Sequence, residues 1–126
     1  MTRILIVDDE RLISWSLGKA ISVAGFDVAI AESGEEALCI LKSSHVDLLI
    51  TDATLPELNG CTLAAEAKRM RPSMPVILIS AKDQAAELAC GGSLIDYSLS
   101  KPFNLPEIVG LVRKLTAKDS TEAYVA

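Results

Sequence analysis

Residues 46–52, Val-Asp-Leu-Leu-Ile-Thr-Asp, form an aliphatic run that stops on a carboxylate. The aliphatic residues at 48–50 do not alternate with polar ones, which is typical of a strand covered on both faces in a parallel sheet. A loop follows, with Pro56 and the Asn59-Gly60 pair as its turn signals. We therefore expect Asp52 at the carboxyl end of a central strand, where open α/β sheets bind their ligands.

Short apolar strands and helical patterns alternate along the rest of the chain. Helix ends are indicated by Gly25 as a C-cap, by a capping box that opens at Ser33 and by a capping signature that opens at Asn104. The expected strands cover residues 3–7, 26–31, 46–52, 75–79 and 95–99, and the expected helices cover residues 13–24, 34–41, 60–70, 82–90 and 105–115. This order predicts an α/β fold with one doubly wound, five-stranded parallel sheet and helices on both faces.

Length and composition indicate a single domain. The chain has 126 residues, half of them hydrophobic, which is enough for a core. Its formal net charge of −5 and the lack of a basic stripe argue against direct nucleic-acid binding. We find no signal peptide, and no apolar run approaches the roughly 20 residues of a membrane span. Cys39, Cys61 and Cys90 fit neither a disulfide framework nor a metal knuckle, so we expect reduced thiols in a cytoplasmic protein.

The residues at which the strands stop carry complementary chemistry, and they are Asp8, Asp9, Asp52, Ser80 and Lys101. In a parallel sheet these ends share one edge, so three carboxylates, a hydroxyl and an ammonium should converge. Crowded carboxylates repel one another unless a cation such as Mg²⁺ joins them. A carboxylate can itself accept a phosphoryl group, whose oxygens a metal and a lysine would neutralise. Taken singly, each residue has an ordinary alternative as a solvated turn, a helix cap or a surface charge.

With these residues in hand, the sequence resembles the receiver domain of bacterial two-component response regulators. The motifs that carry the resemblance are Ile-Leu-Ile-Val-Asp-Asp-Glu at 4–10, Asp-x-x-Leu-Pro-x-x-x-Gly at 52–60, Ile-Ser-Ala at 79–81 and Ser-Lys-Pro-Phe at 100–103. The resemblance implies a (βα)5 flavodoxin-like receiver over residues 1–116, with residues 117–126 as a C-terminal tail or the start of a linker.

The resemblance also implies a phosphoacceptor and a metal site. Asp52 would take a phosphoryl group from a sensor histidine kinase or a histidine phosphotransfer protein. Mg²⁺ would be held directly by Asp9 and Asp52 and by the backbone carbonyl of Thr54, and through water by Asp8.

Two further residues would complete the implied phosphoryl site. Ser80 would bind the phosphoryl group and help to drive a conformational switch, and Lys101 would bridge that group to the acidic cluster across a cis Lys101-Pro102 bond. Such a domain catalyses its own phosphorylation and dephosphorylation, has no turnover on an external substrate, and controls an output domain or target protein. A phosphorylation-dependent homodimer is also compatible with the family.

The sequence departs from the family where the switch is relayed. Receivers commonly carry an aromatic residue three positions before the lysine, but this chain has Ser98 there and Tyr97 one position earlier. Alternation along a strand would send Tyr97 to the opposite face. Residues 89–96 also lack the usual pattern, so we expect intact phosphorylation chemistry and an altered relay.

Three residues outside the motifs have two interpretations each. Leu12 and Trp15 fall off the apolar stripe of the first helix, so we expect them to be exposed and consider kinase docking against partial core packing. His45 lies between a helix and a strand, and we interpret it as a surface turn residue rather than a catalytic one.

Other functions remain open on the residues alone. A phosphatase of the haloacid dehalogenase type also uses an aspartate and Mg²⁺, but it needs a second aspartate at the position that Thr54 occupies here. A flavodoxin-like redox protein would need a phosphate-binding loop where this chain has three acids at residues 8–10. A phosphorylation-independent receiver would normally have lost an acidic or lysine position, and none is lost here.

Overall fold

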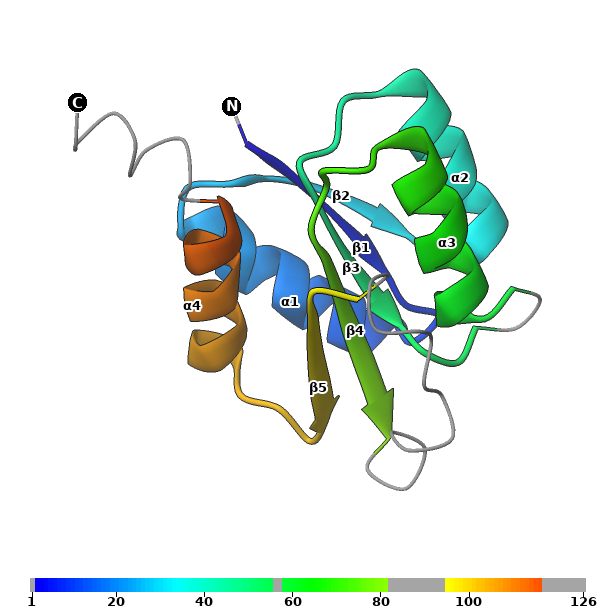
Figure 1. The fold of residues 1–126 in the computed structure, drawn as a ribbon. Coiled ribbons are helices and arrows are strands. Elements are labelled where there is room, and N and C mark those ends of the chain that lie inside the picture. Colours follow the sequence, from blue (N-terminus) through cyan, green and yellow to red (C-terminus); the bar gives the residue numbers. More distant parts are fainter. Residues whose placement is uncertain (1, 56–57, 82–94, 117–126) are drawn as a thin grey trace, which may run out of the picture.

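The computed structural model of the chain describes residues 2–55, 58–81 and 95–116. Its strands are β1 (Arg3–Val7), β2 (Asp27–Ala31), β3 (Leu48–Asp52), β4 (Val76–Ala81) and β5 (Tyr97–Lys101), and its helices are α1 (Arg11–Val23), α2 (Gly34–Ser43), α3 (Gly60–Met70) and α4 (Leu105–Thr116). All five strands are parallel, in the order β2-β1-β3-β4-β5 (Figure 1). The predicted doubly wound parallel sheet is therefore confirmed.

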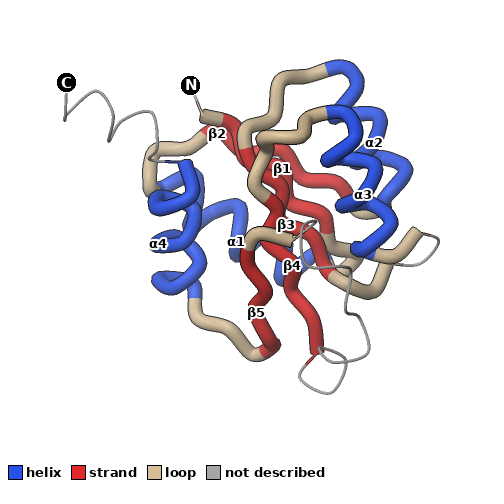
Figure 2. The backbone as a smooth tube through the Cα atoms, viewed as in Figure 1, coloured by secondary structure: helices blue, strands red, loops and turns tan. Residues whose placement is uncertain are grey.

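Helices cover both faces of the sheet, with α1 and α4 on one face and α2 and α3 on the other (Figure 2). Strand β3 is buried at every position. Its Leu49 packs in the core beneath α2 and α3, whereas Leu48 and Ile50 pack in the core beneath α1 and α4. The unbroken aliphatic run at residues 48–50 thus reflects two hydrophobic cores, one on each face.

The predicted helix ends hold in detail. Ser33 Oγ accepts a hydrogen bond from Glu36 N at 3.2 Å, and Asn104 Oδ1 accepts one from Glu107 N at 2.7 Å. Gly25 has φ +104°, a conformation that favours glycine, directly after the end of α1. These local contacts explain why α1, α2 and α4 begin or end close to the positions that the sequence indicates.

The last strand lies two residues later than predicted. It was expected over residues 95–99, but β5 runs from Tyr97 to Lys101, with Ala81 opposite Lys101 in the register with β4. Pairing with β4 therefore extends the strand through polar residues that the apolar pattern excluded. The helix predicted at residues 82–90 lies outside the described residues.

The cysteines do not all match the prediction. Cys39 is an exposed free thiol, but Cys61 is disulfide-bonded, so the expectation of reduced thiols is wrong for Cys61. Cys90 lies outside the described residues. The fold can join cysteines that are remote in sequence, which their spacing alone does not reveal. None of the described helices has both the length and the apolar character needed to cross a membrane.

Candidate functional site

Strand register brings the predicted acids together at the carboxyl edge of the sheet. Val7 of β1 pairs with Thr51 of β3, so the residues that follow, Asp8 and Asp52, lie on adjacent strands at the same level. Asp52 pairs in turn with the β4 residue before Ser80. The site is thus a consequence of strand order, since β3 lies between β1 and β4.

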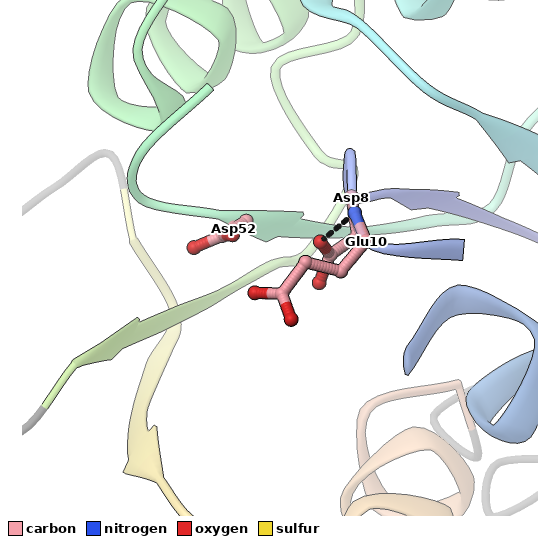
Figure 3. Close-up of side chains that lie close together, drawn as sticks. All are labelled: Asp8, Glu10 and Asp52. Carbon is pink, nitrogen blue, oxygen red and sulfur yellow. Dashed lines mark hydrogen bonds between the residues drawn. The ribbon is translucent and has the colours of Figure 1, made fainter. Parts of the chain in front are cut away.

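Three carboxylates gather at this edge, from Asp8, Glu10 and Asp52. One oxygen of each lies within 4.8 Å of the others, and Asp8 and Asp52 are only 2% and 6% exposed (Figure 3). Glu10 N donates a hydrogen bond to Asp8 Oδ1 at 2.9 Å, which fixes the turn between β1 and α1. Carboxylate oxygens are preferred ligands of hard divalent cations, so this group could hold a metal ion.

The pKa of Asp8 is raised by its surroundings in this group of carboxylates. Burial raises the pKa of Asp8, and the negative charge of Asp52 adds to this effect more weakly. The hydrogen bond from Glu10 N–H and the charge of Lys101 lower that pKa. The net result is a pKa of about 6 instead of 3.8. The ionised carboxylate is therefore held in an environment that disfavours it. A bound cation would remove that penalty, which supports the fit of the site to a metal ion.

Lys101 supplies the positive charge of the site. Its Nζ donates to Asp52 Oδ2 at 3.3 Å and lies 3.5 Å from Glu10 Oε1. Burial alone would lower the pKa of Lys101, but the charge of Asp52 and the hydrogen bond to it raise that pKa above its ordinary value. The ammonium is thus firmly charged beside the Asp52 carboxylate.

Ser80 is buried with an unused hydroxyl. The residue is 1% exposed, and its Oγ has no hydrogen-bond partner among the residues that the structure describes. Leaving such a group unsatisfied is costly, and each case calls for an explanation. Ser80 follows Ile79, the β4 residue that pairs with Asp52, so Ser80 lies at the same edge of the sheet as the carboxylates.

The loop after β3 is held close to Asp52 by α3. Gly60 N, at the start of α3, donates to Ala53 O at 2.9 Å, and Thr54 N donates to Asp52 Oδ1 at 3.3 Å. A Cβ added at Gly60 would lie 2.4 Å from the Asp52 carbonyl oxygen. Glycine is therefore required where the helix meets the strand end.

The structure brings most of the predicted site residues to the same edge of the sheet. It brings Asp8, Asp52 and Lys101 together, with Ser80 on the adjoining strand, as the strand ends predict. Asp9 is exposed and does not belong to the group of close carboxylates. Glu10 was not among the predicted site residues, although it closes the run of three acids at residues 8–10.

The structure also places Leu12, Trp15 and His45, the three residues for which the sequence leaves two interpretations. Leu12 and Trp15 are 77% and 61% exposed on α1, and Lys19 Nζ lies 5.6 Å from the centre of the Trp15 ring. His45 is exposed, with its Nε2 2.7 Å from Asp47 Oδ1 at the opposite edge of the sheet. At the start of β5, Tyr97 and Ser98 are both exposed.

Comparison with known proteins gives one consistent family. Residues 4–113 match the family model of the response regulator receiver domain. A receiver domain from Methanospirillum hungatei superposes with a TM-score of 0.86 at 26% identity, covering 97% of this chain and 98% of that one. The response regulator TrrA from Thermotoga maritima, solved in complex with Mg²⁺ and BeF, has a TM-score of 0.82 at 33% identity, covering 91% of this chain and 99% of that one.

A curated relative extends beyond the region of similarity. Response regulator MprA of Mycobacterium avium is 33% identical over 122 residues, which cover 95% of this chain but 53% of that protein. The chain therefore spans about half the length of the curated relatives that it matches.

Proposed function

The chain belongs to the response regulator receiver domain family of two-component systems, and we propose that Asp52 is its phosphoacceptor. The observation that carries the proposal is a buried Asp52 carboxylate at the end of β3 with the Lys101 ammonium 3.3 Å away. The phosphoryl group would come from a phosphohistidine of a sensor histidine kinase or a histidine phosphotransfer protein. The receiver domain would comprise residues 1–116, with residues 117–126 as a tail or linker.

The proposed cofactor is Mg²⁺. Asp9, Asp52 and the backbone carbonyl of Thr54 would hold the ion directly and Asp8 would hold it through water, and the exposed side chain of Asp9 would turn inward to reach it. A bound Mg²⁺ would offset the charge of the carboxylates and of the phosphoryl oxygens. The Mg²⁺ and BeF in the TrrA complex support this assignment, since BeF imitates a phosphoryl group.

The other site residues have roles that follow from their positions. The Lys101 ammonium would bind a phosphoryl oxygen on Asp52, and its raised pKa keeps it charged at neutral pH. The Ser80 hydroxyl, which lacks a partner among the described residues, would donate to a second phosphoryl oxygen. The gain of a partner by Ser80 would couple phosphorylation to a change of conformation that controls an output domain or target protein.

The partner surface that we propose lies on α1. Leu12 and Trp15 are exposed on the helix that begins directly after Glu10, so a protein bound there would reach the acidic edge. Exposed aromatic and aliphatic side chains of this kind are common at interfaces. Replacing Trp15 with alanine should slow transfer from a phosphorylated kinase while the reaction with acetyl phosphate is unchanged. Equal transfer rates would contradict the assignment of this surface.

The proposal includes no turnover on an external substrate and a cytoplasmic location. The exposed free thiol of Cys39 is usual in a reducing compartment, whereas the disulfide at Cys61 is not. Titration of free thiols in protein purified under reducing and non-reducing conditions measures the state of Cys61. A phosphorylation-dependent homodimer is a further part of the proposal, and light scattering with and without the phosphoryl group tests it.

Phosphorylation by a small donor tests the proposed function directly. Incubation with Mg²⁺ and acetyl phosphate should add one phosphoryl group, stable in acid and labile in base, that mass spectrometry maps to Asp52. Asp52→Asn should remove the adduct, and chelation of Mg²⁺ should prevent it. An undiminished adduct in Asp52→Asn would refute the assignment of the phosphoacceptor.

A further inference from the structure

Glu10 has a side chain whose position the proposed function leaves unexplained. It is the N-cap residue of α1, yet its carboxylate makes no capping hydrogen bond. The carboxylate instead lies 3.5 Å from Lys101 Nζ, which belongs to a residue 91 positions along the chain. Among the described residues, the partner of the Glu10 carboxylate is therefore the ammonium of the acidic edge and not the helix that Glu10 precedes.

The Lys101 ammonium interacts with two carboxylates at once. One ammonium lies 3.3 Å from Asp52 and 3.5 Å from Glu10, so two carboxylates share it. The Asp52 side chain is 7% exposed and the Glu10 side chain is 59% exposed. Glu10 therefore stands on the solvent side of the site, where a phosphoryl donor must enter.

We infer that Glu10 is a specificity-determining residue, whose carboxylate discriminates against phosphoryl donors of high negative charge. The inference rests on the proposed phosphorylation of Asp52. A carboxylate at the entrance repels a doubly negative donor more strongly than a singly negative one. It also withholds part of the Lys101 charge that would otherwise attract the donor. The donors favoured by this arrangement carry phosphorus on a protonated nitrogen, as phosphoramidate does.

The same transfer occurs with both classes of donor. A carboxylate oxygen of Asp52 forms a bond to phosphorus while the bond from phosphorus to the leaving atom breaks, and the leaving atom keeps the electron pair. Acetyl phosphate loses acetate through oxygen. Phosphoramidate, whose nitrogen is already protonated, loses neutral ammonia. The two donors thus differ in net charge at neutral pH while delivering the same phosphoryl group.

The test measures phosphorylation of the wild type and of Glu10→Gln with both donors at saturating Mg²⁺. Calorimetric titration with Mg²⁺ sets that concentration for each variant, so that a difference in Mg²⁺ affinity does not enter the comparison. With acetyl phosphate, Glu10→Gln should react at least about threefold faster than the wild type. With phosphoramidate, the gain of Glu10→Gln over the wild type should be smaller. The gain should shrink as salt rises from 50 to 500 mM, because Glu10 is exposed to solvent.

Glu66→Gln provides a control with the same change in net charge. Glu66 pairs with the exposed Arg69 on the same helix, α3, so its loss should leave the ratio of the two donor rates unchanged. An equal ratio in Glu10→Gln and the wild type, at every salt concentration, overturns the inference while the phosphoacceptor stands. The absence of any adduct from either donor in the wild type overturns the proposed function and this inference together.

Discussion

The two edges of the sheet hold their charges in opposite ways. At the carboxyl edge, three carboxylates lie close together, two of them, Asp52 and Glu10, contact Lys101, and the pKa of Asp8 rises to about 6. At the amino edge, the described charges are matched, because Arg3 pairs with Asp27 at 2.7 Å and Lys68 with Asp96 at 2.8 Å. The carboxyl edge thus holds more negative than positive charge, whereas the ion pairs at the amino edge join residues that are far apart in the sequence.

The amino edge also has an opening. A hollow of about 530 Å³ there is lined by residues that include His45, Asp47 and Arg71. Its polar groups are already engaged, since Arg71 Nη2 donates to the carbonyl oxygens of Leu41 and Ser44 at 2.8 and 2.6 Å. Unsatisfied charge and an unused hydroxyl, rather than the size of a hollow, therefore identify the functional edge of this sheet.

Substitution of one lysine at each edge, Lys101 and Lys68, gives the largest expected difference between the two edges. Lys101→Met should lower the rate of phosphorylation by acetyl phosphate about 100-fold, because the phosphoryl oxygens lose a preorganised positive charge. Lys68→Met should leave that rate within about twofold and lower the free energy of unfolding by about 1 kcal/mol, since Lys68 holds Asp96 at the amino edge. Mass spectrometry and urea denaturation separate the two effects, and similar kinetic losses in both variants would break the comparison.

A pair of glycines gives the next largest effect. Gly60→Ala should lower the free energy of unfolding by about 2 kcal/mol and slow phosphorylation, because its Cβ would lie 2.4 Å from the Asp52 carbonyl oxygen. A Cβ at Gly110 on α4 meets nothing within 4 Å, so Gly110→Ala should stabilise the protein by about 0.5–1 kcal/mol. Chemical denaturation measures both, and a neutral Gly60→Ala would show that the strand end and α3 can separate freely.

The Asp8 carboxylate predicts a pH dependence of stability. Its pKa is raised from 3.8 to about 6, so the folded state binds the proton more tightly than the unfolded chain does. This contribution to stability is fully present below pH 3.8 and is lost as the pH rises through about 6. Asp8→Asn should therefore stabilise the protein by about 1–3 kcal/mol at pH 7.5 in the absence of metal, with no gain at pH 3.5.

Asp47→Asn is the matched substitution at the amino edge. Asp47 accepts a hydrogen bond from Arg3 N at 2.8 Å and contacts His45, so its loss should destabilise the protein by about 1 kcal/mol at pH 7.5. Thermal unfolding followed across pH measures both variants. If Asp8→Asn and Asp47→Asn shift stability in the same direction at neutral pH, the contrast between the edges fails.

Added Mg²⁺ should distinguish the same two variants. At ten times its dissociation constant, the ion should stabilise the wild type by about 1.4 kcal/mol at pH 7.5. The gain should be retained in Asp47→Asn, reduced in Asp8→Asn, and reversed by a chelator. Differential scanning calorimetry measures it, and equal gains in the two variants would exclude Asp8 from the metal site.

Much of this site can be predicted from local sequence patterns. The aliphatic runs before Asp8 and Asp52 predict buried strands, and parallel strands that alternate with helices must end along one edge. Lys101 and Ser80 follow from the same logic, as does their complementarity to a phosphoryl group. The cis Lys101-Pro102 bond, implied by the family resemblance, is present as well. The strands and their end residues depend on periodicity, which neighbouring residues encode, whereas the cis bond is expected from the resemblance alone.

The remaining features depend on contacts between distant residues. The strand end and the family resemblance point to Asp9, and neither can show that the Glu10 side chain contacts a lysine 91 positions away. The two-residue displacement of β5 has the same origin, because pairing with β4 sets where the strand ends. The amino-acid sequence by itself determined which chemical groups meet at the carboxyl edge. Only the tertiary structure decided which of them share Lys101 and which hydroxyl is left unsatisfied, because side-chain conformations and register are set by packing across the sheet.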